Sequence, residues 1–79
     1  MSNTTPNFVP FNGVWWTWND LTGDEIAIKV QVVEEFYEEG DNIPGYNLIS
    51  LEEFDIGYGP RPAGYRISGI DSQAVSKSR

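Results

Sequence analysis

The side chains with the clearest chemical potential in this sequence are carboxylates, and they gather in one short segment. Five of them fall within residues 34–41: Glu34, Glu35, Glu38, Glu39 and Asp41. On a strand, neighbours on one face lie about 6.6 Å apart, and in water each such pair of like charges costs about 0.6 kcal/mol. A positively charged surface would relieve this repulsion, so the cluster predicts docking onto a basic partner protein. The alternative is a solvated strand end that is charged to keep an edge from aggregating.

Three further residues are candidates for short-range contacts with such a partner. Trp, Tyr and Arg are the residue types most often found as interface hot spots. In the tryptophan-rich run at residues 15–18, strand geometry places Trp16 and Trp18 on one face, expected to be the core, and leaves Trp15 on the other. Tyr58 and Arg61 lie in a proline-containing loop, which loses little entropy on binding because it is stiff. The alternative for this loop is a linker whose tyrosines pack over the sheet edge.

Catalytic and metal chemistry find little support in the sequence. The chain has no cysteine and no histidine, which removes the thiolate and imidazole ligands of structural zinc sites. The oxygen-rich segment at residues 19–25 does not have the spacing of a calcium-binding loop. No pair of carboxylates is marked out as acid and base, and no nucleophile motif or phosphate-binding loop is present. We therefore expect no enzymatic activity, no cofactor and no bound metal.

The distribution of charge restricts the class of partner. The net charge is −7, and residues 20–55 carry eleven acidic side chains against Lys29 alone, which gives −10 there. Such a field repels phosphate backbones and anionic lipids, so direct binding to nucleic acid or to a membrane surface is disfavoured. No run approaches the roughly 20 apolar residues of a bilayer span, and the N-terminus lacks the basic start and apolar run of a signal peptide. The sequence predicts a soluble cytoplasmic protein.

The elements that must position these residues are predicted to be strands. Residues 25–37 alternate apolar and polar side chains with a period of two, and many are β-branched. For residues 33–39 a helix capped by Gly40 is the alternative, but it would set like charges four residues apart over one another. Residues 14–18 form a second strand, joined to the first by a turn at residues 20–24 that suits a hairpin. The two strands are expected to pair antiparallel.

Two more strands complete the predicted sheet. The third runs from Tyr46 towards Ile56, and because its apolar positions change phase, we expect a bulge near residues 52–53. Residues 57–64 hold three glycines and two prolines and are expected to be an exposed loop. A fourth strand follows at residues 64–70, with Tyr65 and Ile67 facing the core.

The fold class that follows is mainly β: a small antiparallel sheet or open barrel of about four strands, with little or no helix. A flexible N-terminal leader is expected at residues 1–7, a single domain at residues 8–70 and a polar C-terminal tail at residues 71–79.

These features predict a small acidic protein-binding module or inhibitor that docks on a basic surface of a partner protein. The partner class includes nucleic-acid-binding proteins, whose groove the carboxylates would occupy in place of phosphate. The composition is similar to that of small acidic inhibitors of nucleic-acid machinery encoded by phages, a likeness of composition alone. A homo-oligomer is compatible with this function. The alternative is a structural subunit of a larger assembly, such as a virion or a multisubunit complex.

Overall fold

The structure, a computed structural model, describes residues 3–78 and consists mainly of strands. In chain order, its elements are β1 (Asn3–Thr4), β2 (Phe11–Trp18), β3 (Glu25–Tyr37), β4 (Gly45–Ser50), β5 (Arg66–Asp71), the single-turn 3₁₀ helix η1 (Ser72–Ala74) and β6 (Val75–Lys77). The prediction of a mainly β, antiparallel fold is confirmed. The predicted number of strands is wrong, because residues 3–78 contain six strands rather than about four.

The two additional strands, β1 and β6, lie in the segments expected to be a leader and a tail. β1 pairs with the end of β3, where Asn3 is opposite Tyr37. β6 pairs with β2, where Val75 is opposite Trp15. Strands of two or three residues are too short to show an apolar period, and their backbone pairing with a longer neighbour defines them. Residues 1–2 and 79, at the ends of the expected leader and tail, lie outside the described residues.

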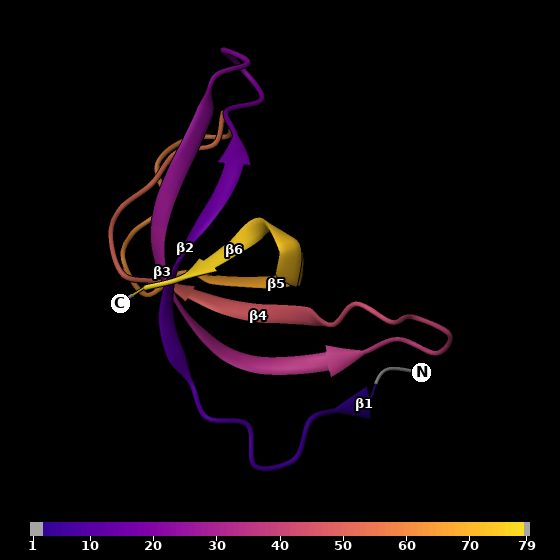
Figure 1. Cartoon of the computed structure of the whole chain (residues 1–79). Coiled ribbons are helices and arrows are strands. Elements are labelled where there is room, and N and C mark those ends of the chain that lie inside the picture. The colour runs from indigo at the N-terminus through magenta and orange to yellow at the C-terminus, as the bar shows by residue number, and fades with distance from the viewer. Residues whose placement is uncertain (1–2, 79) are drawn as a thin grey trace.

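The sheet is strongly curled. Its strand order is β5-β4-β3-β2-β6, with β1 beside the end of β3. The edge strands β5 and β6 are consecutive in the chain and are joined only by the three residues of η1, so the sheet has to bend until its two edges come near each other. Figure 1 shows this bend: β2 follows one half of β3, β4 follows the other half, and β5 and β6 lie inside the curve.

The β2–β3 hairpin is closed by a turn in which the amides of residues 19–24 all donate hydrogen bonds. The amide of Asn19 donates to the carbonyl of Asp24 at 2.8 Å, and the Oδ1 atom of Asn19 accepts from the amides of Leu21 and Thr22 at 2.9 and 3.1 Å. Gly23 supplies a φ of +78°, which a side chain would disfavour. The predicted antiparallel pairing of these two strands is confirmed.

The predicted position of the bulge is wrong. β4 ends at Ser50, and the irregularity lies in β3, where Val32 and Glu34 are opposite consecutive residues of β4 and Val33 is extra. The extra residue switches the face on which β3 side chains point, so core-facing positions are even before it and odd after it. The buried residues of this segment, Leu48, Ser50 and Phe54, all occupy even positions, whereas Leu51 is exposed, so the phase change expected from the sequence does not occur in the core.

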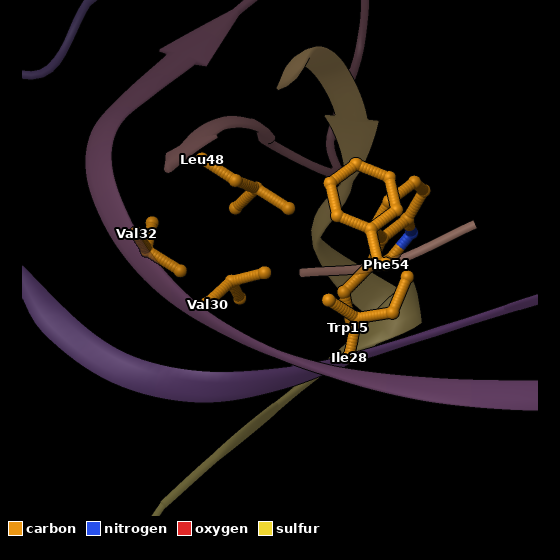
Figure 2. Packing of buried hydrophobic residues seen from close by; sticks show 6 residues of the cluster. All are labelled: Trp15, Ile28, Val30, Val32, Leu48 and Phe54. Atoms are coloured by element: carbon orange, nitrogen blue, oxygen red, sulfur yellow. The ribbon is translucent and has the colours of Figure 1, made fainter. Parts of the chain in front are cut away.

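The core lies on the inner face of the bent sheet. Its buried apolar residues come from β2, β3, β4 and the loop that follows β4: Trp15, Ile28, Val30, Val32, Leu48 and Phe54. Figure 2 shows Phe54 beside Trp15, and the two rings meet edge to face with their centroids 6.3 Å apart. Full burial of a side chain of this kind stabilises the fold by about 1.5–3 kcal/mol.

The long loop between β4 and β5 is tied back to the sheet by Ser50. This buried hydroxyl donates to the carbonyl of Pro62 and accepts from the amide of Tyr65, both at 3.1 Å. Phe54 and Arg61 form an isolated antiparallel bridge within the loop. The fourth strand follows as β5, in which Ile67 packs against the core, whereas Tyr65 remains 42% exposed beside Phe54. The loop therefore has a defined course although its surface is exposed.

Candidate protein-binding site

The acidic cluster spans a strand end and a turn. Residues 33–37 belong to β3, and the chain turns at residues 38–44 before β4, so the strand alternative holds over the helical one. The segment of residues 38–44, called the acidic turn below, reaches out beyond the sheet (Figure 1). Its carboxylates, on Glu38, Glu39 and Asp41, are all exposed. The Asp41 amide donates to the Glu38 carbonyl at 3.0 Å, and Gly40 takes a φ of +85°.

The two glutamates of β3 have partners within the fold. Because Val33 is the extra residue, Glu34 lies opposite Asn47 and Glu35 opposite Tyr46, so the two side chains point to opposite faces. The Nδ2 atom of Asn47 donates to Glu34 at 3.1 Å. Glu35 accepts from the Thr5 hydroxyl at 2.6 Å, and its backbone carbonyl accepts from the Thr5 amide at 2.8 Å. Glu34 and Glu35 are half-buried, and their hydrogen bonds tie β4 and the residue after β1 to β3.

A cavity of about 280 Å³ lies beside the acidic turn. The residues that line it come from the ends of β3, β4 and β5 and from the turn: Phe36, Glu38, Asp41, Ile43, Pro44, Gly45, Gly69, Ile70 and Asp71. Its lining includes apolar residues and three carboxylates, those of Glu38, Asp41 and Asp71. Among the described residues, none of those that line the cavity is basic. The cavity thus combines an apolar wall with a negative rim.

One row of residues across three strands creates this cavity. Phe36 of β3 is opposite Gly45 of β4, and Gly45 is opposite Asp71 of β5. Gly45 carries no side chain, so the Phe36 ring lies directly against its backbone, and all three residues line the cavity. A Cβ atom at Gly45 would come within 2.5 Å of the Phe36 ring. Sequence reasoning missed these three residues, because their alignment depends on the register of three strands; the only local signal is a glycine directly after Pro44.

The predicted exposure of the tryptophans is reversed in the structure. Trp15 is 6% exposed and belongs to the core, whereas Trp16 and Trp18 are 46% and 58% exposed. Trp15 is opposite Ile28, and core residues of β3 at this end occupy even positions, which are paired with odd positions of β2. The alternation of the faces was predicted correctly, but the choice of the inner face was wrong, because the identical side chains at residues 15, 16 and 18 carry no information about it. Trp15 is therefore not available as a surface anchor.

Tyr58 and Arg61 lie away from the acidic turn. The Tyr58 hydroxyl donates to the carboxylate of Asp20, which lies in the β2–β3 turn at the other end of β3. This hydrogen bond raises the pKa of Tyr58, and the charge of Asp20 adds to the effect. Arg61 lies over the ring of Tyr65, 5.6 Å from its centroid. Of the predicted partner-binding residues, the structure brings together the carboxylates of the acidic turn and places Trp15, Tyr58 and Arg61 elsewhere.

Metal-binding groups and helical membrane spans are absent from the part of the chain that the structure describes. Within residues 3–78, no group of three or more acidic side chains is arranged to hold a metal ion. No helix in the same range has the length and apolar character of a membrane span. Comparison with known proteins finds no matching family model, no matching curated protein and no matching solved structure.

Proposed function

We propose that this chain is a protein-binding module that docks its acidic turn onto a basic surface of a partner protein. The observation that carries the proposal is the placement of Glu38, Glu39 and Asp41 on a turn that projects from the sheet with all three side chains exposed. Charges at the tip of a projection approach a partner first and meet little steric hindrance. Electrostatic complementarity of this kind raises the association rate and selects partners by charge.

The positions of the basic side chains support a local excess of negative charge at the acidic turn. Two of the basic side chains are held over aromatic rings: Arg61 lies over Tyr65, and Lys77 lies 5.4 Å from the centroid of Phe11. Neither belongs to the acidic turn. A basic partner therefore meets a local excess of negative charge there, and proteins that bind nucleic acid through basic grooves belong to the partner class we propose. The chain would act on such a protein as an inhibitor by occupying the groove.

The experiment that tests the proposal compares two triple variants with the same net charge. One removes the charges of the acidic turn (Glu38→Gln, Glu39→Gln and Asp41→Asn), and the matched control removes three exposed charges elsewhere (Asp24→Asn, Glu25→Gln and Glu53→Gln). Each is used as bait for host lysate at low salt and then at high salt, where the Debye length falls from about 10 Å to about 3 Å. We expect wild type and control to capture the same basic proteins and to release them at high salt.

The turn variant should lose those proteins. If both variants bind like wild type, or if both lose binding equally, the acidic turn is not a docking site and the proposal is refuted.

The second candidate function is a structural subunit of a larger assembly, and one observation favours it. Trp16 and Trp18 are exposed on the outer face of β2, where large apolar side chains commonly mark an interface. An interface built on these residues predicts one partner that is retained at high salt and lost when both tryptophans are changed to serine. If the acidic-turn variant still retains this partner, the second function is favoured over the first.

A further inference from the structure

We propose that the cavity beside the acidic turn binds one arginine side chain of the partner protein. This inference rests on the proposed function, since it specifies how a basic partner is recognised at the same end of the molecule. It goes beyond charge attraction because it requires the shape of the cavity, which the strand register creates, as well as the carboxylates around it.

The apolar wall suits the body of an arginine side chain. Phe36, Ile43 and Pro44 contribute apolar surface to the cavity, against which the methylene stem of a long cationic side chain can pack. An aromatic face also attracts a guanidinium group, by about 0.5–2 kcal/mol depending on burial. The ring of Phe36 lies over Gly45 and lines the cavity. An arginine side chain inserted here would place its stem against apolar residues and its guanidinium group near the Phe36 ring.

The rim suits the charged head of the same side chain. Glu38, Asp41 and Asp71 all contribute to the cavity, and they come from two different parts of the chain, the acidic turn and the end of β5. A guanidinium group presents five N–H donors in a planar fork that fits carboxylates, whereas an ammonium group is a compact and strongly hydrated point charge. Asp71 already accepts a hydrogen bond from the Gln73 amide at 2.7 Å, but a carboxylate has about four acceptor sites. The charge and geometry therefore favour arginine over lysine.

The size of the cavity suits a single side chain. Pockets for drug-sized ligands usually measure roughly 300–1,000 Å³, and this one measures about 280 Å³. The negative rim opposes phosphates and carboxylates, and the acidic side chains of residues 3–78 form no metal-binding group. A monovalent, elongated cation with an apolar stem satisfies each of these constraints.

The direct test is an NMR titration of the ¹⁵N-labelled protein with N-acetyl-arginine methylamide. We expect saturable shifts of the amide signals of Gly45, Gly69 and Ile70, which line the cavity. The matching citrulline derivative has nearly the same shape without the charge, and it should cause no such shifts. The lysine derivative should bind about tenfold more weakly, because it lacks the planar fork. Absence of saturable shifts at these amides, or an equal response to citrulline, would overturn the inference.

The variant Gly45→Ala tests the shape of the cavity without changing its charge. It leaves every carboxylate in place, but its Cβ would meet the Phe36 ring at 2.5 Å and force the ring to move. We expect the affinity for the arginine derivative to fall about tenfold or more, the scale of a lost cation–aromatic contact. If this variant does not fold, as judged by the dispersion of its amide signals, Phe36→Leu serves instead, since it keeps an apolar side chain and removes the aromatic face.

The same variant distinguishes failure of this inference from failure of the proposed function. In the capture experiment, loss of partners by the acidic-turn variant together with full retention by Gly45→Ala would mean that the turn docks by charge alone and the arginine site is wrong. Loss by both variants supports the site. Capture that is unaffected by the acidic-turn variant refutes the proposed function, and the site is then judged by the titration alone.

Discussion

The reversed placement of the tryptophans leads to a prediction that tests the register of the whole sheet. Trp15 is in the core, and Trp16 and Trp18 are largely exposed. Replacing a buried Trp by Ala costs about 3–5 kcal/mol, against a total stability of roughly 4–12 kcal/mol for a chain of this length. Trp16→Ala removes the partial packing of a half-exposed ring and an exposed hydrogen bond from its Nε1 atom to the Ser76 hydroxyl, together about 1–2 kcal/mol. Trp18→Ala should cost no more than about 0.5 kcal/mol.

The assay is thermal unfolding of the three variants, monitored by far-ultraviolet circular dichroism because tryptophan fluorescence changes with each substitution. For a domain of this size 1 kcal/mol corresponds to about 4–8 °C in melting temperature, so Trp15→Ala should lower it by about 12 °C or more. Trp15→Phe provides a milder variant if the alanine variant does not fold. If Trp16→Ala or Trp18→Ala destabilises as much as Trp15→Ala, the register of β2 is shifted by one residue and every side chain on it faces the other way.

Three further predictions concern the loop and the tyrosines. Gly57→Ala should destabilise more than Gly64→Ala in urea unfolding. Both glycines have a positive φ, +106° and +88°, which costs about 1–3 kcal/mol for another residue, but only at Gly57 would a Cβ atom also meet backbone, at 2.8 Å. Equal losses of stability would contradict the packing of the loop on the hairpin. Ser50→Ala should cost about 1–3 kcal/mol, because it removes two hydrogen bonds of a buried hydroxyl, each of which contributes about 0.5–1.5 kcal/mol. It should also speed proteolysis between residues 51 and 65, and unchanged cleavage would argue that Ser50 does not hold the loop to the sheet. Burial raises the pKa of Tyr46 above its usual 10.0, and the charge of Glu35 adds to this. The stability of the fold should therefore be unaffected below pH 10 and fall as the pH rises through the raised value. Tyr46→Phe should flatten that fall in unfolding curves measured from pH 8 to 11.

Much of the fold follows from local patterns in the sequence. The alternation of apolar and polar residues located β3 with its correct bounds, and turn residues such as Gly23 located the hairpin that pairs it with β2. Local patterns give no signal where a strand is very short or polar. β1 and β6 contain two and three residues, and their pairing depends on where the longer strands leave a free edge.

The candidate site was predictable only in its charge. The acidic turn is visible in the sequence because Glu38, Glu39 and Asp41 are neighbours along the chain. The cavity beside it is not, because Phe36, Gly45 and Asp71 become neighbours only through the register of three strands. That register in turn depends on the extra residue Val33, for which the amino-acid types give no local signal. Charge is a property of composition, whereas shape requires the complete sheet.

The pairing of β6 with β2 has a consequence for the order in which the molecule folds. Val75 and Trp15 are 60 positions apart in the chain but opposite each other in the sheet, whereas the β2–β3 and β3–β4 pairs join consecutive strands. Contacts between distant segments form slowly, because the intervening chain must first lose its freedom. On a ribosome the hairpins would form first, and the edge of β2 beside Trp15 would stay open until Val75 has emerged. We expect that interval to be when a growing chain is most prone to pair with another copy.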